Sequence, residues 1–423
     1  MRLREFHQKV WELDRITFSI HPLNERDLPR IFAERDKELD RAVTTVFDTS
    51  RNLLVYGLFG IGKSVFIEAM FKDLRDTYPN EVLCVFETLD GIDSDIKTTI
   101  LRGLARELSQ EDEEAKHVHQ LLSGVELTEQ QTNKAAGSGE AGIAGLLKVG
   151  GGVEETVTET WARKLVPNAA YQIRNLIQRA NARRPGRRLI VAVDDLDKRD
   201  PATVRANLAD ARPMLQEDCS FVFTGHPLGI LRQAYDSVGG IFDLELELKM
   251  LPKASMRLLM ERYLDAGRRP DAKRRGVFPF TEEAAEIVIN HALGIPRVMN
   301  VICLNILQEA GDMRSAEIDL AVLHECWKRA GEKLRRAIRS DLRYVFEVFK
   351  ERRKGLDPEK ATDEIFDSLG VESYASLIAK LNAATREDLL VSIEQAGKSL
   401  FLPQPLLQPL VDNPENPSEE SQK

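Results

Sequence analysis

Residues 51–70 read RNLLVYGLFGIGKSVFIEAM, an apolar run that ends in a glycine-rich loop closed by a lysine and a serine. The loop fits the pattern GxxxxGK[ST], in which backbone N–H groups and a helix N-terminus hold phosphate groups. Lys63 is expected to reach the β- and γ-phosphates, and Ser64 is expected to bind magnesium. The stretch therefore predicts a nucleotide site lined by Gly57, Phe59, Gly60, Ile61, Gly62, Lys63, Ser64 and Val65.

The residues on either side of the loop give it the strand, loop and helix order that the motif requires. Leu53–Tyr56 form an apolar run typical of a buried strand, and the apolar side chains of Val65–Leu74 recur at helical spacing. An accidental glycine-rich turn would need neither neighbour. The other strands of a parallel α/β sheet flanked by helices are predicted at residues 82–86, 189–193, 219–224 and 242–248.

The composition is that of an ordinary soluble protein, and 423 residues suffice for two or three domains. A formal charge of −9 argues against a protein that coats nucleic acid by bulk charge, although a local basic patch is compatible with it. Four widely spaced cysteines, at 84, 219, 303 and 326, favour reduced core thiols over a zinc site. We find no signal peptide and no apolar run that could cross a bilayer, so we expect a cytoplasmic protein without membrane contact.

A second chemical element is RRLIVAVDDLDK, at residues 187–198. Leu189–Val193 is typical of a buried strand, and it is followed by Asp194, Asp195 and Asp197. Carboxylates crowded at a strand end are costly unless a cation or a structured polar site receives them. Beside a phosphate loop this is the Walker B pattern, in which Asp194 holds magnesium and Asp195 orients or deprotonates the attacking water. Asp197 is expected to cap the next turn.

The strand expected at 219–224 ends in further polar candidates. Thr224 stands where a polar residue on a neighbouring strand tip can sense the γ-phosphate. His226 is the one histidine of seven beside the expected site. It is interpreted as a loop or partly buried residue, with a functional hydrogen bond as the alternative.

Two other segments carry alternatives. Residues 31–47 predict a helix with one buried stripe, in which Phe32 either belongs to the core or, with Ile31, flanks the adenine. The region 111–160 combines an acidic run with many glycines. It is interpreted as a variable insertion, with a loop that touches a partner as the alternative.

By this point the order of elements resembles that of the AAA+ ATPases. Residues 251–264 and 280–307 look like the helices of their lid, and a GxPRxxN match resembles the second sensor of the origin-recognition initiator branch: Gly294, Pro296, Arg297 and Asn300. The resemblance implies that Arg297 reaches the γ-phosphate, a contact that exists only while ATP is bound. A surface ion pair is the alternative for this arginine. FAERDKEL at 32–39 resembles the initiators' adenine segment, which implies base contacts by Phe32 and Arg35.

The chain also departs from the initiator pattern. The second Walker B acid is Asp195 where the family usually has glutamate, and the run VDDLD is closer to STAND and KAP-type signalling ATPases. Between Thr224 and residue 242 the one arginine is Arg232, so an arginine finger acting in trans is poorly supported. These departures bear on fast, ring-coupled hydrolysis more than on ATP binding.

Residues 331–410 read as a third unit. The stretch 333–354 is an amphipathic helix, and shorter helices and a hairpin follow, which resembles the initiators' winged helix. Its expected recognition helix, 373–388, offers only Lys380 and Arg386 as cations, with Glu372, Glu387 and Asp388 nearby. Other basic residues gather at Arg335, Arg336, Arg339, Arg343, Arg352, Arg353 and Lys354, and in an expected lid loop at Arg268, Arg269, Lys273, Arg274 and Arg275. Each cluster contacts phosphates or forms a solvated or protein-docking face.

These observations divide the chain into segments at 1–30 (extension), 31–250 (P-loop core), 251–330 (lid), 331–410 (winged-helix-like) and 411–423 (disordered tail). We expect an ATP- and Mg²⁺-dependent AAA+ switch with slow ATP hydrolysis. It would couple nucleotide state to assembly, or to binding of duplex DNA or a protein partner. The alternative is a STAND- or KAP-like signalling ATPase, for example in bacterial defence, that acts through protein contacts without DNA.

Overall fold

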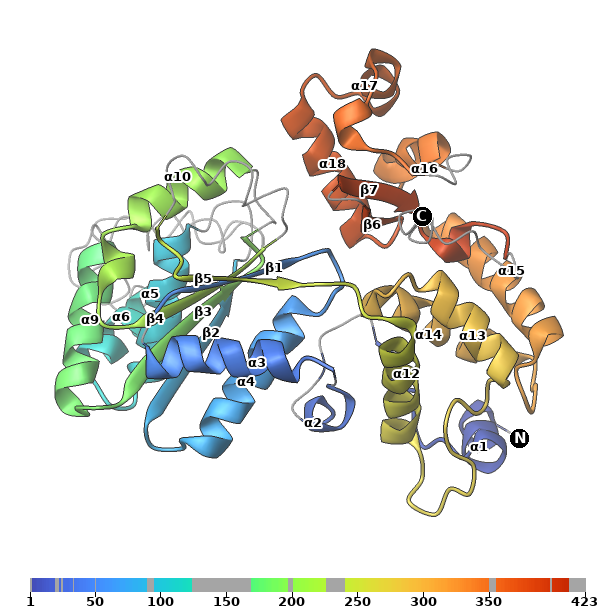
Figure 1. The fold of residues 1–423 in the computed structure, drawn as a ribbon, viewed down its shortest axis with the longest axis horizontal. Coiled ribbons are helices and arrows are strands. Elements are labelled where there is room, and N and C mark those ends of the chain that lie inside the picture. Colours follow the sequence, from blue (N-terminus) through green and yellow to red (C-terminus); the bar gives the residue numbers. More distant parts are fainter. Residues whose placement is uncertain are drawn as a thin grey trace, which may run out of the picture.

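The computed structural model describes residues 2–19, 23, 26–32, 34–49, 51–89, 95–123, 169–196, 201–225, 240–349, 355–395 and 398–410. Figure 1 shows two halves of the molecule: the sheet with its flanking helices forms one half, and a helical lid with a C-terminal module forms the other. Several predictions concern residues outside these ranges: Asp197, His226, Arg232, Arg352, Arg353, Lys354, most of the glycine-rich insertion and the tail.

The core is a five-stranded parallel sheet, and the predicted fold class is confirmed. Its order is β2 (Val82–Thr88), β3 (Arg188–Asp194), β4 (Ser220–Gly225), β1 (Leu53–Gly57) and β5 (Leu244–Leu248). One face is covered by α3 (Asp36–Val43) and α4 (Lys63–Thr77). The other face is covered by α5 (Ile96–Leu108), α6 (Glu113–Ser123), α9 (Ala169–Arg183) and α10 (Pro201–Ala211). Apolar side chains are needed on both faces, which explains the unbroken apolar runs.

The continuous helix expected over 31–47 is wrong. The chain instead forms α2 (Leu28–Ile31), α3 and a π-helical turn at Thr44–Asp48, with a break between the first two. At the break Glu34 has a φ of 66°, and its carboxylate accepts a hydrogen bond of 2.8 Å from Ser255 in the lid. Contacts with the lid therefore override the local helical pattern.

The lid consists of α12 (Lys253–Gly267), α13 (Glu282–His291), α14 (Pro296–Asp312) and α15 (Leu320–Ala337). The first residues of the chain, with α1 (Leu3–Phe6), pack into the same core and lie beside these helices (Figure 1). Trp11 is fully buried there, and its Nε1 donates to the Ser315 carbonyl at 3.0 Å. The lid is thus built from both the start and the middle of the chain.

The C-terminal module comprises α16 (Arg343–Phe349), α17 (Asp363–Leu369), α18 (Tyr374–Arg386) and a hairpin of β6 (Leu390–Gln395) and β7 (Lys398–Pro403). The last two helices and the hairpin are those expected, and the assignment of the module as a winged helix stays a prediction. The single helix expected over 333–354 is wrong, because α15 ends at Ala337. The next residue, Ile338, has non-helical backbone angles (φ −58°, ψ 123°) and buries its side chain in the module's core.

The hairpin joins this module to the lid. Val391, Ile393 and Leu402 lie in the lid core, whereas Leu390 and Phe401 lie in the module's own core. The residues after the hairpin return to α15, where the Gln408 carbonyl accepts from Trp327 Nε1 at 3.0 Å. Since one hairpin serves two cores, the module and the lid share a continuous packed structure.

All four cysteines are buried within this fold. Among the described residues, no helix combines the length and apolarity that a membrane span requires.

Candidate nucleotide site

The phosphate loop connects β1 to the N-terminus of α4. Gly62 has a φ of 99° and immediately precedes the helix, which begins at Lys63. This left-handed backbone suits glycine, because a Cβ there is strained. The N-terminus of α4, which in this motif presents backbone N–H groups to phosphate, thus directly follows the loop.

Lys63 is held within the loop. Its side chain is buried, and Nζ donates to the carbonyl oxygens of Gly57 at 3.0 Å and Leu58 at 3.2 Å. The ammonium also lies 5.3 Å from the centre of the Phe59 ring. Ile61 anchors the loop in the core with 2% exposure. The charge of Lys63 is therefore concentrated at the loop backbone.

Asp194, at the end of β3, is the most deeply buried carboxylate of the site, with 3% exposure. It accepts hydrogen bonds from the hydroxyl groups of Thr224 and Ser64. Burial raises the pKa of Asp194, and the neighbouring Asp195 raises it further, while Ser64, Thr224 and Lys63 act in the opposite direction. A hydroxyl and a carboxylate brought together beside a phosphate loop are the oxygen donors that Mg²⁺ prefers.

Thr224 links both acids of the expected Walker B pair. Besides donating to Asp194, its Oγ1 accepts the backbone N–H of Asp195 at 3.0 Å. Asp195 has a φ of 64°, so the chain turns sharply just after the strand. Its side chain is only half-buried. The structure thus separates the two acids, one enclosed in the sheet edge and the other at its rim.

The segment expected to hold adenine lies where the core meets the lid. The ring of Phe32 is 6.4 Å from that of Phe66 in α4, and its carbonyl accepts a hydrogen bond from Arg262 in α12. Arg35 is buried, which lowers its pKa, and its Nη2 donates to the Lys249 carbonyl at 2.7 Å. Arg35 therefore joins two backbone segments, and base contact by either residue stays a prediction.

Arg297 lies directly against the phosphate loop. It occupies the first turn of α14, and its backbone N–H donates to the Gly60 carbonyl at 3.2 Å. A Cβ on Gly60 would lie only 2.6 Å from Arg297 Cβ, so glycine permits this approach. The structure thus brings the lid arginine to the loop, and its contact with the γ-phosphate stays a prediction.

The guanidinium of Arg297 has a partner that sequence reasoning missed. Its Nε and Nη2 donate to the two carboxylate oxygens of Asp388 at 2.8 and 3.1 Å, and Nη2 also donates to the Arg386 carbonyl at 3.0 Å. In the sequence, Asp388 is merely an acid after the expected recognition helix. Nothing in that pattern connects it with a residue 91 positions earlier.

The C-terminal module also approaches the core at two other points. The guanidinium of Arg386 lies 5.9 Å from the centre of the Phe59 ring in the phosphate loop. Glu394 of β6 shares a hydrogen bond with Glu247 of β5. The nucleotide site is therefore bordered by core, lid and module.

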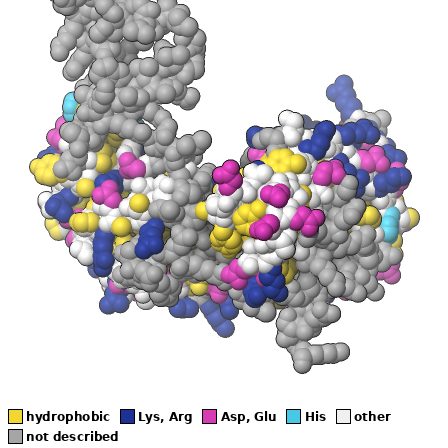
Figure 2. All heavy atoms as spheres, turned by 90° about the horizontal axis from the view of Figure 1, so that it is seen from above, with side chains coloured by type: hydrophobic (Ala, Val, Ile, Leu, Met, Phe, Trp, Pro, Cys, Tyr) yellow, Lys and Arg dark blue, Asp and Glu magenta, His cyan; other side chains and the backbone are white. Residues whose placement is uncertain are grey.

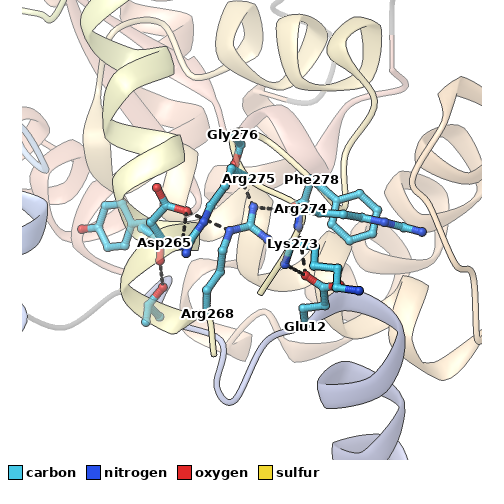
Figure 3. Close-up of polar contacts among 10 residues, drawn as sticks. Glu12, Asp265, Arg268, Lys273, Arg274, Arg275, Gly276 and Phe278 are labelled. Atoms are coloured by element: carbon cyan, nitrogen blue, oxygen red, sulfur yellow. Dashed lines mark hydrogen bonds and ion pairs between the residues drawn. The ribbon is translucent and has the colours of Figure 1, made fainter. Parts of the chain in front are cut away.

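The basic loop between α12 and α13 is a separate feature (Figure 3). Arg268 is buried and donates to Asp265 and to the carbonyls of Gly276 and Phe278. The Glu12 carboxylate accepts the backbone N–H groups of Lys273 and Arg274 at 2.6 and 3.0 Å. These contacts hold the loop onto the N-terminal segment and give the buried charge of Arg268 a structural role.

Comparison with known proteins supports the assignment of the core. Residues 32–217 match the family described as the AAA ATPase domain. No curated protein matches the chain significantly.

Three solved structures illustrate the wider likeness. The Aeropyrum pernix Orc1 protein in complex with DNA is 13% identical, with 94% of this chain and 96% of that chain covered and a TM-score of 0.46. The Aeropyrum pernix Orc2 protein is 10% identical (93% and 94% covered, TM-score 0.47). The Thermotoga maritima RuvB Holliday junction branch migration motor is 11% identical (91% and 96% covered, TM-score 0.43). Scores below 0.5 assign neither a branch nor a partner.

The family match includes the loop, the β3 acids and three strands of the sheet, β1, β2 and β3. Residues 32–217 are therefore similar to AAA ATPase domains, and they contain a loop of the P-loop pattern.

Proposed function

We propose that this protein is an AAA+ switch that binds ATP with Mg²⁺ between core and lid and hydrolyses it slowly. Its nucleotide state would control how the C-terminal module meets DNA or a protein partner. The observation that carries the proposal is the approach of Arg297 to Gly60, because it brings a lid cation to a phosphate loop whose lysine and acids belong to the core.

Each residue has a distinct role in this proposal. Lys63 binds the β- and γ-phosphates, while Ser64 and Asp194 hold Mg²⁺, which when bound offsets phosphate charge. Asp195, at the rim, orients or deprotonates the attacking water. Thr224 fixes the relative position of the two acids and lies next to the γ-phosphate. Arg297 contacts the γ-phosphate and so distinguishes ATP from ADP.

The cations of the module bear on its partner. On α18 the exposed residues include Tyr374, Ala375 and Ala379, while Lys380 donates to the Leu369 carbonyl at 2.7 Å. Arg335 and Arg339 are likewise engaged, with the Leu407 carbonyl and Glu387. On the face drawn in Figure 2, basic and acidic side chains are interspersed over the described surface. Binding of duplex DNA through α18 alone is therefore disfavoured.

The test is to measure ATP turnover and nucleotide retention, with and without Mg²⁺ and duplex DNA. Turnover that requires Mg²⁺ supports the proposal, and stimulation by DNA identifies DNA as the partner. Undetectable turnover with tight nucleotide retention would favour the signalling ATPase instead. Failure to bind either ATP or ADP would overturn both.

A further inference from the structure

Asp388 lies outside the ATPase core and the lid, yet it forms the main side-chain contact of the lid arginine. The pair is bidentate, with the Nε and Nη2 edge of Arg297 on both carboxylate oxygens. The Arg386 carbonyl accepts a further hydrogen bond from Nη2. Nη1 makes no hydrogen bond with any residue that the structure describes, and the arginine side chain is 34% exposed. One edge of the guanidinium is therefore held while the other can meet an anion.

The other end of Arg297 is fixed as well. Its backbone N–H is bonded to Gly60, and a Cβ on that glycine would meet Cβ, Cγ and Cδ of Arg297 at 2.6, 3.4 and 3.2 Å. The aliphatic stem thus runs along the phosphate loop. An arginine fixed at both ends has few rotamers to lose when it binds a phosphate, and this preorganisation strengthens binding.

The position of Asp388 is set by the end of α18. Its φ of 55° places it in the left-handed region, and its N–H donates to the Thr385 carbonyl at 3.2 Å. Glu387, the residue before it, points to a different partner, Arg339, at 3.3 Å. Two adjacent acids thus have separate surroundings, and only one of them contacts the arginine at the loop.

We propose that Asp388 is a positioning residue of the nucleotide site: it holds Arg297 so that Nη1 contacts the γ-phosphate of ATP. The C-terminal module therefore contributes to the discrimination between ATP and ADP without touching the nucleotide. This inference rests on the proposed role of Arg297 as the γ-phosphate contact.

The substitution Asp388→Asn tests it in the full-length protein. Asparagine tolerates the left-handed backbone, but its NH₂ group replaces one acceptor oxygen and breaks the bidentate pair. We expect ATP affinity to fall roughly tenfold, the lower end of what outer partners of metal ligands contribute. ADP affinity should not change, because ADP has no γ-phosphate. Both are measured by calorimetric titration with Mg²⁺. Glu387→Gln removes the same charge one residue away and should leave both affinities unchanged.

A double-mutant cycle shows whether Asp388 acts through the arginine. Arg297→Ala should lower the preference for ATP, and adding Asp388→Asn should then have no further effect. Asp388→Gly, which also accepts this backbone, should reproduce the asparagine result. Unchanged ADP affinity reports that each variant is folded.

Several results would overturn the inference. If Arg297→Ala lowers the preference for ATP but Asp388→Asn does not, the inference fails while the proposed function stands. A rise in ATP affinity would mean that Asp388 withholds the arginine from ATP, which also rejects positioning. If Arg297→Ala leaves the preference intact, the proposed role of the arginine fails first.

Discussion

Two regions of the site differ in how they are held together. Asp194 and Thr224 come from adjacent strands, are 3% and 0% exposed, and are set side by side by the hydrogen-bonded ladder of β3 and β4. Arg297 and Asp388 come from the lid and the module, and their side chains are 34% and 20% exposed. We call the first region, at the carboxyl ends of β3 and β4, the sheet edge. We call the second region, the contact of Arg297 with Asp388, the junction.

The difference suggests that the two regions have different functions. A sheet edge fixed by backbone bonding keeps the same geometry with any ligand, which suits phosphate and metal chemistry. A junction of several separate segments can change with the ligand, which suits recognition of the nucleotide state. Substitutions at the sheet edge should therefore impair chemistry or binding of all nucleotides, whereas those at the junction should change the preference among them.

The largest effect is expected at the rim of the sheet edge. Asp195→Asn should lower ATP turnover by about 10²- to 10⁴-fold, since this is what a general base typically contributes. ATP binding should be retained, because the backbone N–H to Thr224 is unaffected. Turnover by phosphate release and affinity by titration measure the two effects. Asp210→Asn, which alters an exposed ion pair with Lys97, is the control. Equal turnover in wild type and Asp195→Asn would reject this assignment.

Next in size is the loss of the loop lysine. Lys63→Ala should weaken binding of both ATP and ADP by roughly a hundredfold, which corresponds to a charged hydrogen bond of about 3 kcal/mol. Lys72→Ala, an exposed position of the same helix paired with Asp76, should bind normally. Loss of ATP binding with normal ADP binding would show that Lys63 distinguishes between nucleotides, as only the junction is expected to do. That result would contradict the comparison.

Two glycines sharpen the comparison in terms of stability. Gly60 and Gly186 both have positive φ, 74° and 87°, but only Gly60 faces Arg297, while Gly186 has open space around its α-carbon. Alanine should cost about 1–2 kcal/mol at either position for the backbone. At Gly60 the new methyl group would also clash with Arg297, which should cost about a further 1–3 kcal/mol and push the lid away from the loop. The unfolding temperature and the preference for ATP over ADP should therefore fall more in Gly60→Ala than in Gly186→Ala. Equal losses would show that the close approach contributes little.

The smallest effect concerns pH. Burial raises the pKa of Glu394 above its ordinary 4.5, the negative charge of Glu247 raises it further, and Lys249 opposes them. A raised pKa favours the protonated form. The stabilisation by the contact of Glu394 with Glu247 is therefore fully present below pH 4.5 and is lost as pH rises through the higher value. Glu394→Gln stays neutral and should unfold at a higher temperature than wild type only toward neutral pH. Thermal unfolding scans from below pH 4.5 to neutral pH test this prediction, with Glu317→Gln, at an exposed position, as the control. A difference independent of pH would contradict the assignment.

Much of the sheet edge could be predicted because its signals are local. The GxxxxGK[ST] match specifies a loop conformation, and the unbroken apolar run before Asp194 specifies a buried strand whose end carries the acids. The meeting of Thr224 with Asp194 follows from the order of parallel strands, since their carboxyl ends share one edge.

The junction could not be predicted in the same way. Arg297 was found through a motif, but its partner Asp388 depends on how an entire module packs on the lid. The break at Glu34 has the same origin, because Ser255 in the lid stabilises a backbone that the helical pattern excludes. Local periodicity records which face is buried and does not record which distant residue covers it.

The path of the chain between core and lid has a mechanical consequence. Ile31 lies in the lid core and α3 on the sheet, so the chain crosses from lid to core between these two, and it crosses again at 249–252. Arg35 of the first crossing is bonded to the Lys249 carbonyl of the second. A body tethered at a single point can swivel freely, whereas one tethered at two linked points keeps chiefly a rocking motion about the line that joins them. Such a linkage would restrict the lid to rocking about this line, and the C-terminal module, which packs on the lid, would move with it.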